Sequence, residues 1–373
     1  MCAKLAAVNP EAARKWGAAR ATRPVRILVV QRDNIGDLVL ATPFVRALRA
    51  ALPDATIDAF VSSYTAAVLE RNPDLNNVFS YVKGKHRAPG QPLVSLWGRM
   101  IGLVLDLRRR RYDLAVLPGL FYSPTTIRFA RATRPACIAG FVPSRAEPDD
   151  RVALPVFIDD FSDEHVIARR KVLLDAILGR AAAPTDPEPP PCAIYPDAAR
   201  VAAMKARVRS KLGNFSRLVG IHISARRPAQ RWPEDRWVEF LHQYLRAGDA
   251  AILMWSPGAE DDPRHPGDDA KAARILERCS DLPIVPCETP ELPDLIAAMS
   301  LVDFLVCSDG GAMHVAAALG KPMVCFFGRS SPEHWRPWKA RHAVLRPDSQ
   351  EVADVTVAQV LDAAASIAEE PAR

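Results

Sequence analysis

The feature that most constrains the fold of this chain is a regular alternation of short apolar runs with longer amphipathic stretches. A short run that is apolar throughout is typical of a strand buried on both faces, and the amphipathic stretches are typical of helices that cover a parallel sheet. The first series of runs is RILVV, TIDAFV, VFSYV and DLAVL, and the second is LVGIHI, AAILMW, PIVPC, DFLVC and PMVCFF. The alternation predicts two doubly wound α/β domains with parallel sheets.

A proline-rich stretch, RAAAPTDPEPPPC at residues 180–192, separates the two series. Its prolines remove backbone donors and favour an extended chain, so it is interpreted as an interdomain linker. Open parallel sheets bind ligands at the carboxyl ends of their strands, and the ligand site is expected in a cleft between the facing domains. The predicted organisation is an N-terminal extension, a first domain, the linker, a second domain and a C-terminal helix that packs on the domains: residues 1–24, 25–183, 184–192, 193–345 and 346–373.

Charge narrows the classes of partner. The formal net charge is +6 and the sequence pI is about 9.0, which suits anionic partners such as phosphorylated glycans, nucleotides or an acidic membrane surface. The arginines are scattered and no nucleic-acid module is recognisable, so no nucleic-acid partner is predicted.

The cysteines and the apolar segments indicate a compartment. The seven cysteines are odd in number, form no CxxC pair and mostly sit in apolar runs, which is typical of reduced, packed thiols. The first residues, MCAKLAAVNPEAARKW, lack the apolar core of a secretory signal. No segment supplies the roughly 20 apolar residues of a membrane span. The prediction is a cytoplasmic protein.

The stretch ILVVQRDNIGDLVLATP, residues 27–43, links the first predicted strand to a helix. The strand is expected to end near Val30. Thr42 and Pro43 are interpreted as the start of the helix, with the threonine hydroxyl as its cap and the proline at a position that needs no amide donor.

Two residues of this stretch are candidates for function. Gly36 lets a ligand or the facing domain approach the backbone closely, and Asp37 is expected to project into the cleft. The loop alone favours a structural interpretation of Asp37, in which its carboxylate caps a helical turn that starts at Leu38.

A second candidate is VCSDGGAMHVAAALGKPMVCFFG, residues 306–328, in which a strand is followed by two glycines and a helix of small residues starting near Ala312. Free amides and the macrodipole at such a helix start predict a phosphate-binding site. Asp309 and His314 flank it. His314 either donates to a phosphate or is a histidine hydrogen-bonded within the domain interface.

A third candidate is IHISARRPAQRWPEDRW, residues 221–237, which places three arginines on one strand-to-helix loop. Guanidinium groups bind diphosphates through paired hydrogen bonds, so Arg226, Arg227 and Arg231 are candidate diphosphate ligands. The alternative is a solvated surface loop.

Glu260, in MWSPGAEDD after the next strand, is placed to accept from a ribose hydroxyl pair or is a plain exposed acid. The absence of GxGxxG disfavours a dehydrogenase, and the absence of GxxxxGK[ST] disfavours a P-loop NTPase. No DxD, HExxH or cysteine cluster indicates a metal site. Charge stabilisation is therefore expected from arginines and helix amides.

Three motifs in this order resemble glycosyltransferase family 9, the lipopolysaccharide heptosyltransferases with the GT-B fold. The family's opening strand and GD loop is similar to ILVVQRDNIGDLVLATPFVRALRAALPDA. Its GAS..KRWP loop is similar to HISARRPAQRWP, and its SDTGxMHLAAALGxP segment to SDGGAMHVAAALGKP. The resemblance extends from about residue 25 to residue 345.

The resemblance implies inverting, metal-independent transfer of a sugar, usually from ADP-heptose, to a hydroxyl of a lipid-linked core oligosaccharide. It implies that Asp37 is the general base and that Asn34 and Gly36 bind the acceptor. No cofactor is implied beyond the nucleotide sugar, which is a substrate. The implied donor-binding residues are Ser224, Arg226, Arg227, Gln230, Arg231, Trp232, Glu260, Asp309, Gly310, Gly311 and His314.

The chain departs from the family pattern at two positions. Gln230 stands where the family commonly has lysine, and Gly310 where it often has threonine. These departures keep two alternatives open, namely a family member that uses another nucleotide sugar for a capsule or surface glycan, and a non-catalytic nucleotide-sugar-binding protein.

The stretch SLWGRMIGLVLDLRRRRYD, residues 95–113, predicts an apolar helix that ends in Arg108 to Arg111. One interpretation is a core helix whose terminal cations suit its dipole. The other is a basic patch for a phosphorylated, lipid-linked acceptor or for the cytoplasmic face of the inner membrane.

Overall fold

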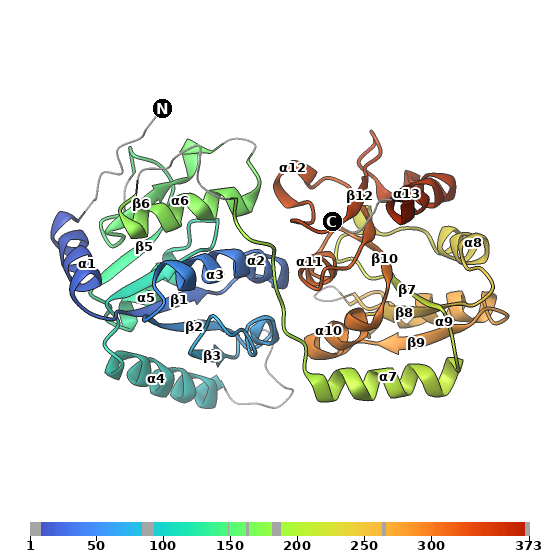
Figure 1. The fold of residues 1–373 in the computed structure, drawn as a ribbon, viewed down its shortest axis with the longest axis horizontal. Helices are drawn as coiled ribbons and strands as arrows, with labels where there is room; N and C mark the ends of the chain where they lie inside the picture. Colours follow the sequence, from blue (N-terminus) through green and yellow to red (C-terminus); the bar gives the residue numbers. More distant parts are fainter. Residues whose placement is uncertain are drawn as a thin grey trace. The chain divides into compact units, whose positions relative to one another are not determined.

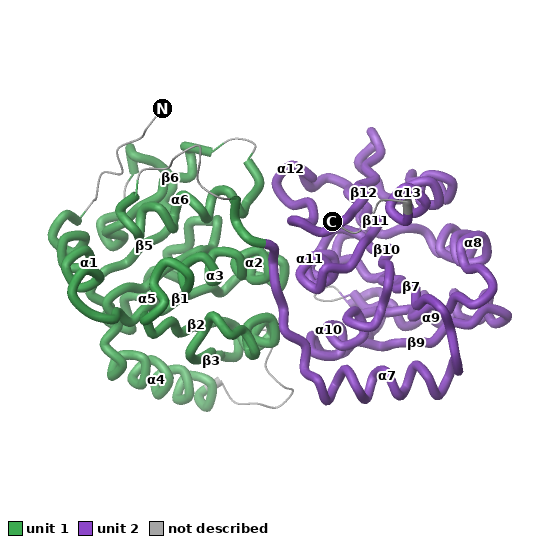
Figure 2. Tube along the Cα trace, in the orientation of Figure 1, with its two compact units in different colours: residues 1–190 green, residues 191–373 purple. Residues whose placement is uncertain are grey.

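The structure, a computed structural model, describes residues 9–83, 93–147, 149–161, 164–180, 188–262 and 266–369. The chain divides into two compact units, residues 1–190 and residues 191–373 (Figure 2). The division falls within residues 180–192, the stretch interpreted as a linker, of which residues 181–187 lie outside the described residues. Residues 1–8 of the predicted N-terminal extension also lie outside them.

Unit 1 is built on a six-stranded sheet whose described pairings are all parallel, in the order β3-β2-β1-β4-β5-β6 (Figure 1). Its strands are β1 Arg26–Gln31, β2 Thr56–Ser62, β3 Asn77–Tyr81, β4 Leu114–Leu117, β5 Cys137–Val142 and β6 Leu154–Phe157. Its helices are α1 Pro10–Thr22, α2 Ile35–Val39, α3 Thr42–Ala51, α4 Leu93–Arg109, α5 Pro124–Ala132 and α6 Val166–Leu178.

Unit 2 repeats this topology with the order β12-β11-β10-β7-β8-β9, again in parallel pairs. Its strands are β7 Arg217–His222, β8 Asp249–Trp255, β9 Ile284–Glu288, β10 Phe304–Ser308, β11 Met323–Phe326 and β12 His342–Leu345. Its helices are α7 Ala198–Leu212, α8 Glu234–Tyr244, α9 Asp269–Arg278, α10 Leu292–Leu301, α11 Gly311–Ala318, α12 Pro332–Trp335 and α13 Val357–Glu369. The two parallel sheets confirm the predicted fold class.

The apolar runs form the centres of both sheets, as their composition predicts. In β1 the five residues from Ile27 to Gln31 are buried, because helices cover both faces of a parallel sheet. Three strands were not among the predicted runs, namely β5, β6 and β12. β12 is an edge strand of its sheet and is only half buried, so its apolar signal is weak.

The terminal helices each belong to one unit. In unit 1, the indole of Trp16 in α1 is buried and its Nε1 donates to the carbonyl of Ile177, 2.8 Å away. In unit 2, α13 packs on the core through Val360, Ala364 and Ile367, which follow the helical spacing that the sequence shows. The C-terminal helix is thus part of the second unit's core.

The start of the first helix differs from the sequence expectation. The helical turn α2 begins at Ile35, three residues before the expected Leu38. The hydroxyl of Thr42 donates to the carbonyl of Val39 at 2.7 Å instead of capping α3, whose N-cap is Ala41. The reason is local: α2 leads almost directly into α3, so the preceding turn already occupies the position where a free cap would lie.

The six cysteines within the described residues are all buried free thiols. Over the described part of the chain, no helix combines the length and the hydropathy that crossing a bilayer requires. The same part of the chain holds no group of three or more His, Cys, Asp or Glu side chains arranged to bind a metal ion.

Candidate functional site

In both units, the loop after the first strand contacts the loop after the fourth strand. In unit 1 these loops follow β1 and β4, and a Cβ placed on Gly119 would lie only 2.6 Å from Oδ2 of Asp33. In unit 2 they follow β7 and β10, and Nε2 of Gln230 donates to Oδ2 of Asp309 at 3.1 Å. In each sheet the first three strands are added toward one edge and the last three toward the other, so the strand order reverses between the first and fourth strands. Open α/β sheets bind ligands at this point. We call these two loop pairs the unit 1 and unit 2 switch points.

Asp37 lies at the third position of α2 in a capping box with Asn34. The backbone N–H and the side-chain Nδ2 of Asn34 each lie 3.3 Å from Oδ2 of Asp37. No group among the described residues is found donating to its other oxygen, Oδ1. The carboxylate of Asp37 therefore does take part in capping a helical turn, although the turn starts earlier than expected. Only Oδ2 is used in this way, and Oδ1 is left open.

The backbone around Asp37 is held by Arg170, a residue that the sequence analysis did not identify. This guanidinium reaches the loop from α6 and is 1% exposed. Its nitrogens donate to the carbonyls of Pro118, Leu40 and Asp37 at 3.0, 3.2 and 3.1 Å. Because one rigid cation bonds the loop after β4 and two points of the α2 segment, it fixes where Asp37 lies.

A second carboxylate, Asp33, stands beside Asp37. Burial raises the pKa of Asp33 above its usual range, and the negative charge of Asp37 raises it further. Arg170 and Lys83 oppose that shift. The unit 1 switch point thus holds a pair of interacting carboxylates.

Two cations accompany this acidic pair. Nε of Arg32 donates to the hydroxyl of Tyr81 at 2.5 Å, and its guanidinium lies 4.1 Å above the ring of Phe129. The ammonium of Lys83 donates to the carbonyl of Arg32. The cation–π contact and the hydrogen bonds order these side chains, which makes them suitable for an anionic ligand.

In unit 2, Asp309 accepts from Gln230 and from the hydroxyl of Ser330. Burial raises the pKa of Asp309, while these hydrogen bonds and the charge of Arg227 oppose the shift. The side chain of Gln230 therefore orients the carboxylate of Asp309. The hydroxyl of Ser308, at the end of β10, donates to the backbone carbonyl of Gln230 at 2.6 Å. The two loops of this switch point are thus joined by a hydrogen bond from each to the other.

The predicted phosphate-binding turn lies next to these hydrogen bonds. Helix α11 begins at Gly311, with Gly310 as its N-cap, and both residues are half buried. His314 is on the first turns of the same helix and is 4% exposed. Free N–H groups at the start of α11 point along the helix axis and favour an anion there.

The three arginines of the loop after β7 have different surroundings. Arg226 and Arg227 are exposed. Arg231 is half buried: its Nε donates to the carbonyl of Ala225 at 2.9 Å, and its Nη1 lies 3.5 Å from Oδ1 of Asp268. Only Arg226 and Arg227 have their charges in solvent, whereas Arg231 belongs to a buried network.

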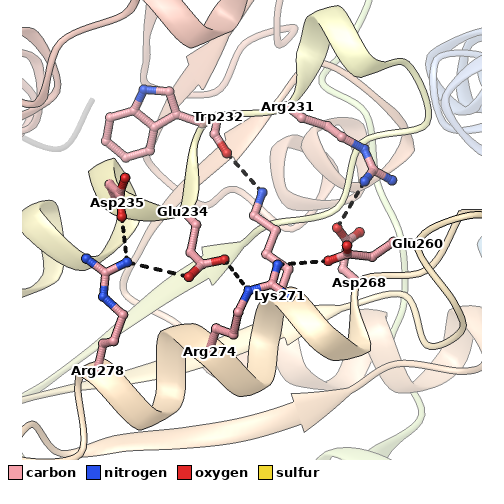
Figure 3. A network of polar contacts seen from close by, with 9 residues as sticks. All are labelled: Arg231, Trp232, Glu234, Asp235, Glu260, Asp268, Lys271, Arg274 and Arg278. Atoms are coloured by element: carbon pink, nitrogen blue, oxygen red, sulfur yellow. Dashed lines mark hydrogen bonds and ion pairs between the residues drawn. The ribbon is translucent and has the colours of Figure 1, made fainter.

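This network includes two buried residues that the sequence analysis missed, Asp268 and Lys271 (Figure 3). The ammonium of Lys271 donates to the carbonyl of Trp232 at 2.9 Å. Burial lowers the pKa of Lys271 to about 8, although Asp268 opposes the shift. Burial also raises the pKa of Asp268, against the effects of Ser224 and Arg231. The network ties the arginine loop to α9.

Three predicted donor ligands have other partners in the structure. The side chain of Trp232 is 1% exposed and packs edge-on against Trp237 at a ring separation of 4.7 Å, so its predicted role as a ligand is wrong: the indole is a core residue. Glu260 forms an ion pair with Arg274 at 3.1 Å (Figure 3). Ser224 accepts from the backbone N–H of Ser256 at 2.9 Å and so joins the loops after β7 and β8.

Comparisons with known proteins find relatives along most of the chain. The model of glycosyltransferase family 9 (heptosyltransferase) matches residues 100–364. Lipopolysaccharide heptosyltransferase 2 of Salmonella typhimurium is 28% identical over 327 residues, which are 86% of this chain and 88% of that protein.

Two solved structures have a similar fold. The glycosyl transferase family 9 protein of Veillonella parvula DSM 2008 matches with a TM-score of 0.74 and 20% identity, covering 92% of this chain and 97% of that one. E. coli ADP-heptose LPS heptosyltransferase II matches with a TM-score of 0.69 and 20% identity, covering 92% and 98%. These likenesses confirm the predicted GT-B fold.

Proposed function

This chain belongs to glycosyltransferase family 9, and we propose that it transfers heptose from ADP-heptose to a hydroxyl of a lipopolysaccharide core acceptor. We propose further that the transfer inverts the anomeric centre and uses no metal. The donor follows the name of the E. coli protein, and the acceptor follows that of the Salmonella protein. The observation that carries the proposal is the carboxylate of Asp37, which is held on one oxygen and open on the other.

In this mechanism Asp37 is the general base. Its Oδ1 takes the proton of the acceptor hydroxyl while that oxygen attacks the anomeric carbon from the face opposite the leaving diphosphate. A carboxylate is a far weaker base than an alkoxide, so the proton moves only as the new bond forms. Asn34 and Arg170 keep the carboxylate in place, the first through its capping hydrogen bonds and the second through the backbone.

Departure of the nucleoside diphosphate leaves negative charge that unit 2 is suited to stabilise. The N–H groups of Gly311 and Ala312 at the start of α11 are preorganised donors, and Arg226 and Arg227 supply positive charge. Asp309, whose position is fixed by Gln230 and Ser330, is suited to accept from a sugar hydroxyl. This arrangement needs no metal ion to neutralise the leaving group.

The acceptor part of the proposal rests on the surroundings of Asp37. Arg32 and Lys83 are in or beside the loop that carries this base, and their charges suit a phosphorylated core oligosaccharide. Since the core is assembled on a lipid, the proposal includes peripheral contact of the protein with the cytoplasmic face of the inner membrane.

A panel of nucleotide sugars tests the donor. ADP-heptose at about 100 times its dissociation constant should stabilise the protein by about 2.7 kcal/mol in a thermal-shift assay, and transfer to a core acceptor should follow. A shift with a uridine or thymidine sugar in place of ADP-heptose would instead favour the alternative donor, to which the departures at Gln230 and Gly310 point. Donor binding without transfer to any acceptor would indicate a non-catalytic binding protein.

A further inference from the structure

Helix α4 of unit 1 presents an apolar stripe to solvent. Along its exposed side the fractional exposures of Val94, Trp97, Ile101 and Leu105 are 81, 66, 57 and 42%. Their spacing of three, four and four residues places them on one line along the helix. Scattered exposed apolar residues are ordinary, but an aligned set that includes tryptophan marks an interaction surface.

The stripe is separate from the face by which α4 packs on its own unit. Met100, Leu103 and Leu107 make that inner contact, with Leu107 fully buried in the core of unit 1. A Cβ placed on Gly98 or Gly102 would meet no atom of the described residues within 4 Å, so the outer side of the helix is open. The core-helix interpretation of this segment is thus correct for one face only.

The arginines at the end of α4 are less available than the sequence suggests. Nε of Arg108 donates to the carbonyl of Ala132, and Arg110 forms an ion pair with Asp58 at 3.3 Å while lying 4.6 Å over the ring of Phe79. Arg109 forms an ion pair with Asp106 at 2.8 Å. Three of the four arginines in the basic-patch interpretation of residues 108–111 are therefore engaged within unit 1, besides Arg109 these being Arg108 and Arg110. Still, residues 93–109 contain three arginines and one aspartate, which is a net charge of +2.

The first turns of α4 lie toward the strand ends that carry Asp37. The opposite end of the helix is fixed at the amino ends of the strands, because Nη1 of Arg26, at the start of β1, donates to the carbonyl of Arg110 at 2.8 Å. A helix of 17 residues is about 25 Å long and spans the sheet back to its carboxyl edge. Trp97 is therefore on the side of unit 1 where the loop with Asp37 lies.

We infer that the α4 stripe, formed by Val94, Trp97, Ile101 and Leu105, docks unit 1 on an anionic lipid bilayer. An exposed apolar line with tryptophan, on a helix of net positive charge, matches the boundary between acyl chains and acidic headgroups. Docking by this face would bring the edge that carries Asp37 near a lipid-linked acceptor. That consequence rests on the proposed sugar transfer. The docking itself does not need the transfer, and it assigns a surface to the membrane contact that is part of the proposed function.

Vesicle flotation tests the inference. The unmodified chain should float with vesicles of phosphatidylglycerol and phosphatidylcholine and bind pure phosphatidylcholine at least tenfold more weakly. The double variant Trp97→Glu, Ile101→Glu should lose at least tenfold in binding to the anionic vesicles. The matched control Ser95→Glu, Gly102→Glu adds the same two charges to exposed positions off the stripe and should bind as the unmodified chain does.

Three results would overturn the inference: no flotation of the unmodified chain, equal flotation of the stripe variant, or a dimer in sedimentation that only the stripe variant dissolves. The last result would identify a second copy of the chain as the occupant. Transfer to a water-soluble, deacylated acceptor separates this test from the proposed function. The stripe variant should retain full activity there, and failure of the unmodified chain in that assay would count against the proposed function alone.

Discussion

The two switch points share one topology and differ in chemistry. Unit 1 places two interacting carboxylates, Asp33 and Asp37, after its first strand. Unit 2 places a hydrogen-bonded acid, Asp309, beside the start of a helix and a loop of arginines. In the proposed function, the same strand order carries a proton acceptor in one unit and an anion-binding surface in the other. The difference lies entirely in the loops, which is why the fold alone does not fix the function.

The units also differ in how they hold these loops. In unit 1 a single buried cation, Arg170, bonds three backbone carbonyls and leaves the Asp37 side chain partly open. In unit 2 the loop is held by a network of side chains that includes Asp268 and Lys271 (Figure 3). A general base contacts a hydroxyl group that changes during the reaction, whereas a site for a leaving group benefits from rigid hydrogen-bond donors.

The strongest test of this division is Asp37→Asn. Asparagine keeps the shape and the capping contacts but is not a base, so turnover should fall by about 10² to 10⁴ while ADP-heptose affinity is unchanged. Steady-state kinetics and donor titration measure the two quantities. Asp54→Asn, at an exposed position of unit 1, is the control and should leave both unchanged. Loss of donor affinity in Asp37→Asn would contradict the division.

Arg170→Lys should have the next largest effect. Lysine keeps the charge but lacks the planar fork that reaches three carbonyls, so Asp37 loses its fixed position and kcat should fall by about tenfold to a hundredfold. Donor affinity should be unaffected, since the contacts of Arg170 are within unit 1. The comparison variant is Arg131→Lys on the exposed side of α5. An unchanged kcat in Arg170→Lys would show that the loop needs no such anchor.

Lys271→Met tests the buried network of unit 2 through pH. The folded protein binds the lysine proton less tightly than the unfolded chain, with a pKa of about 8 against 10.5 for a solvated lysine. Between these values the unfolded state holds more protons, so the free energy of unfolding of the unmodified chain should rise relative to the variant, by up to about 1.4 kcal/mol per pH unit. Below pH 8 this difference should be flat.

Urea titrations at pH 7, 8, 9 and 10 measure this difference. Lys205→Met replaces an exposed lysine of α7 and should show no such slope relative to the unmodified chain. Parallel pH curves for the unmodified chain and Lys271→Met would mean that Lys271 titrates like a solvated lysine.

The smallest expected effect is that of Gln230→Lys, which restores the residue that the family commonly has. The ammonium would replace the amide beside Asp309 and add a cation near the diphosphate, so the dissociation constant of ADP-heptose should fall about threefold, or roughly 0.6 kcal/mol. Isothermal titration measures it. Gln243→Lys adds the same charge at an exposed position of α8 and should not change affinity. Weaker donor binding in Gln230→Lys would show that the hydrogen bond from Gln230 to Asp309 contributes more to donor affinity than an added positive charge.

Much of the fold follows from the sequence because buried parallel strands are apolar throughout, and such runs are visible without a partner. The loop of Asp37 was also visible, since its glycine and acid follow such a run. Arg170 was not, because it lies 133 residues from the backbone group it bonds. Lys271 and Asp268 resemble surface residues at a helix start, and only the packing of α9 buries them.

Trp232 shows the opposite error. A tryptophan beside arginines in a loop resembles a ligand-binding group, and the motif reinforces that interpretation. In the structure its Nε1 donates to the carbonyl of Val355 at 2.8 Å and the ring fills the core of unit 2. A tryptophan packed in the core and one that binds a ligand have the same local sequence pattern, so only the tertiary contacts distinguish them.

The measurement that tests the central claim most directly is the anomeric configuration of the product. The protein is incubated with ADP-heptose and a core acceptor, and the new glycosidic bond is assigned by NMR from its anomeric coupling constants. Attack opposite the leaving diphosphate with Asp37 as base predicts one product whose configuration is opposite to that of the donor. A product with retained configuration would contradict the account.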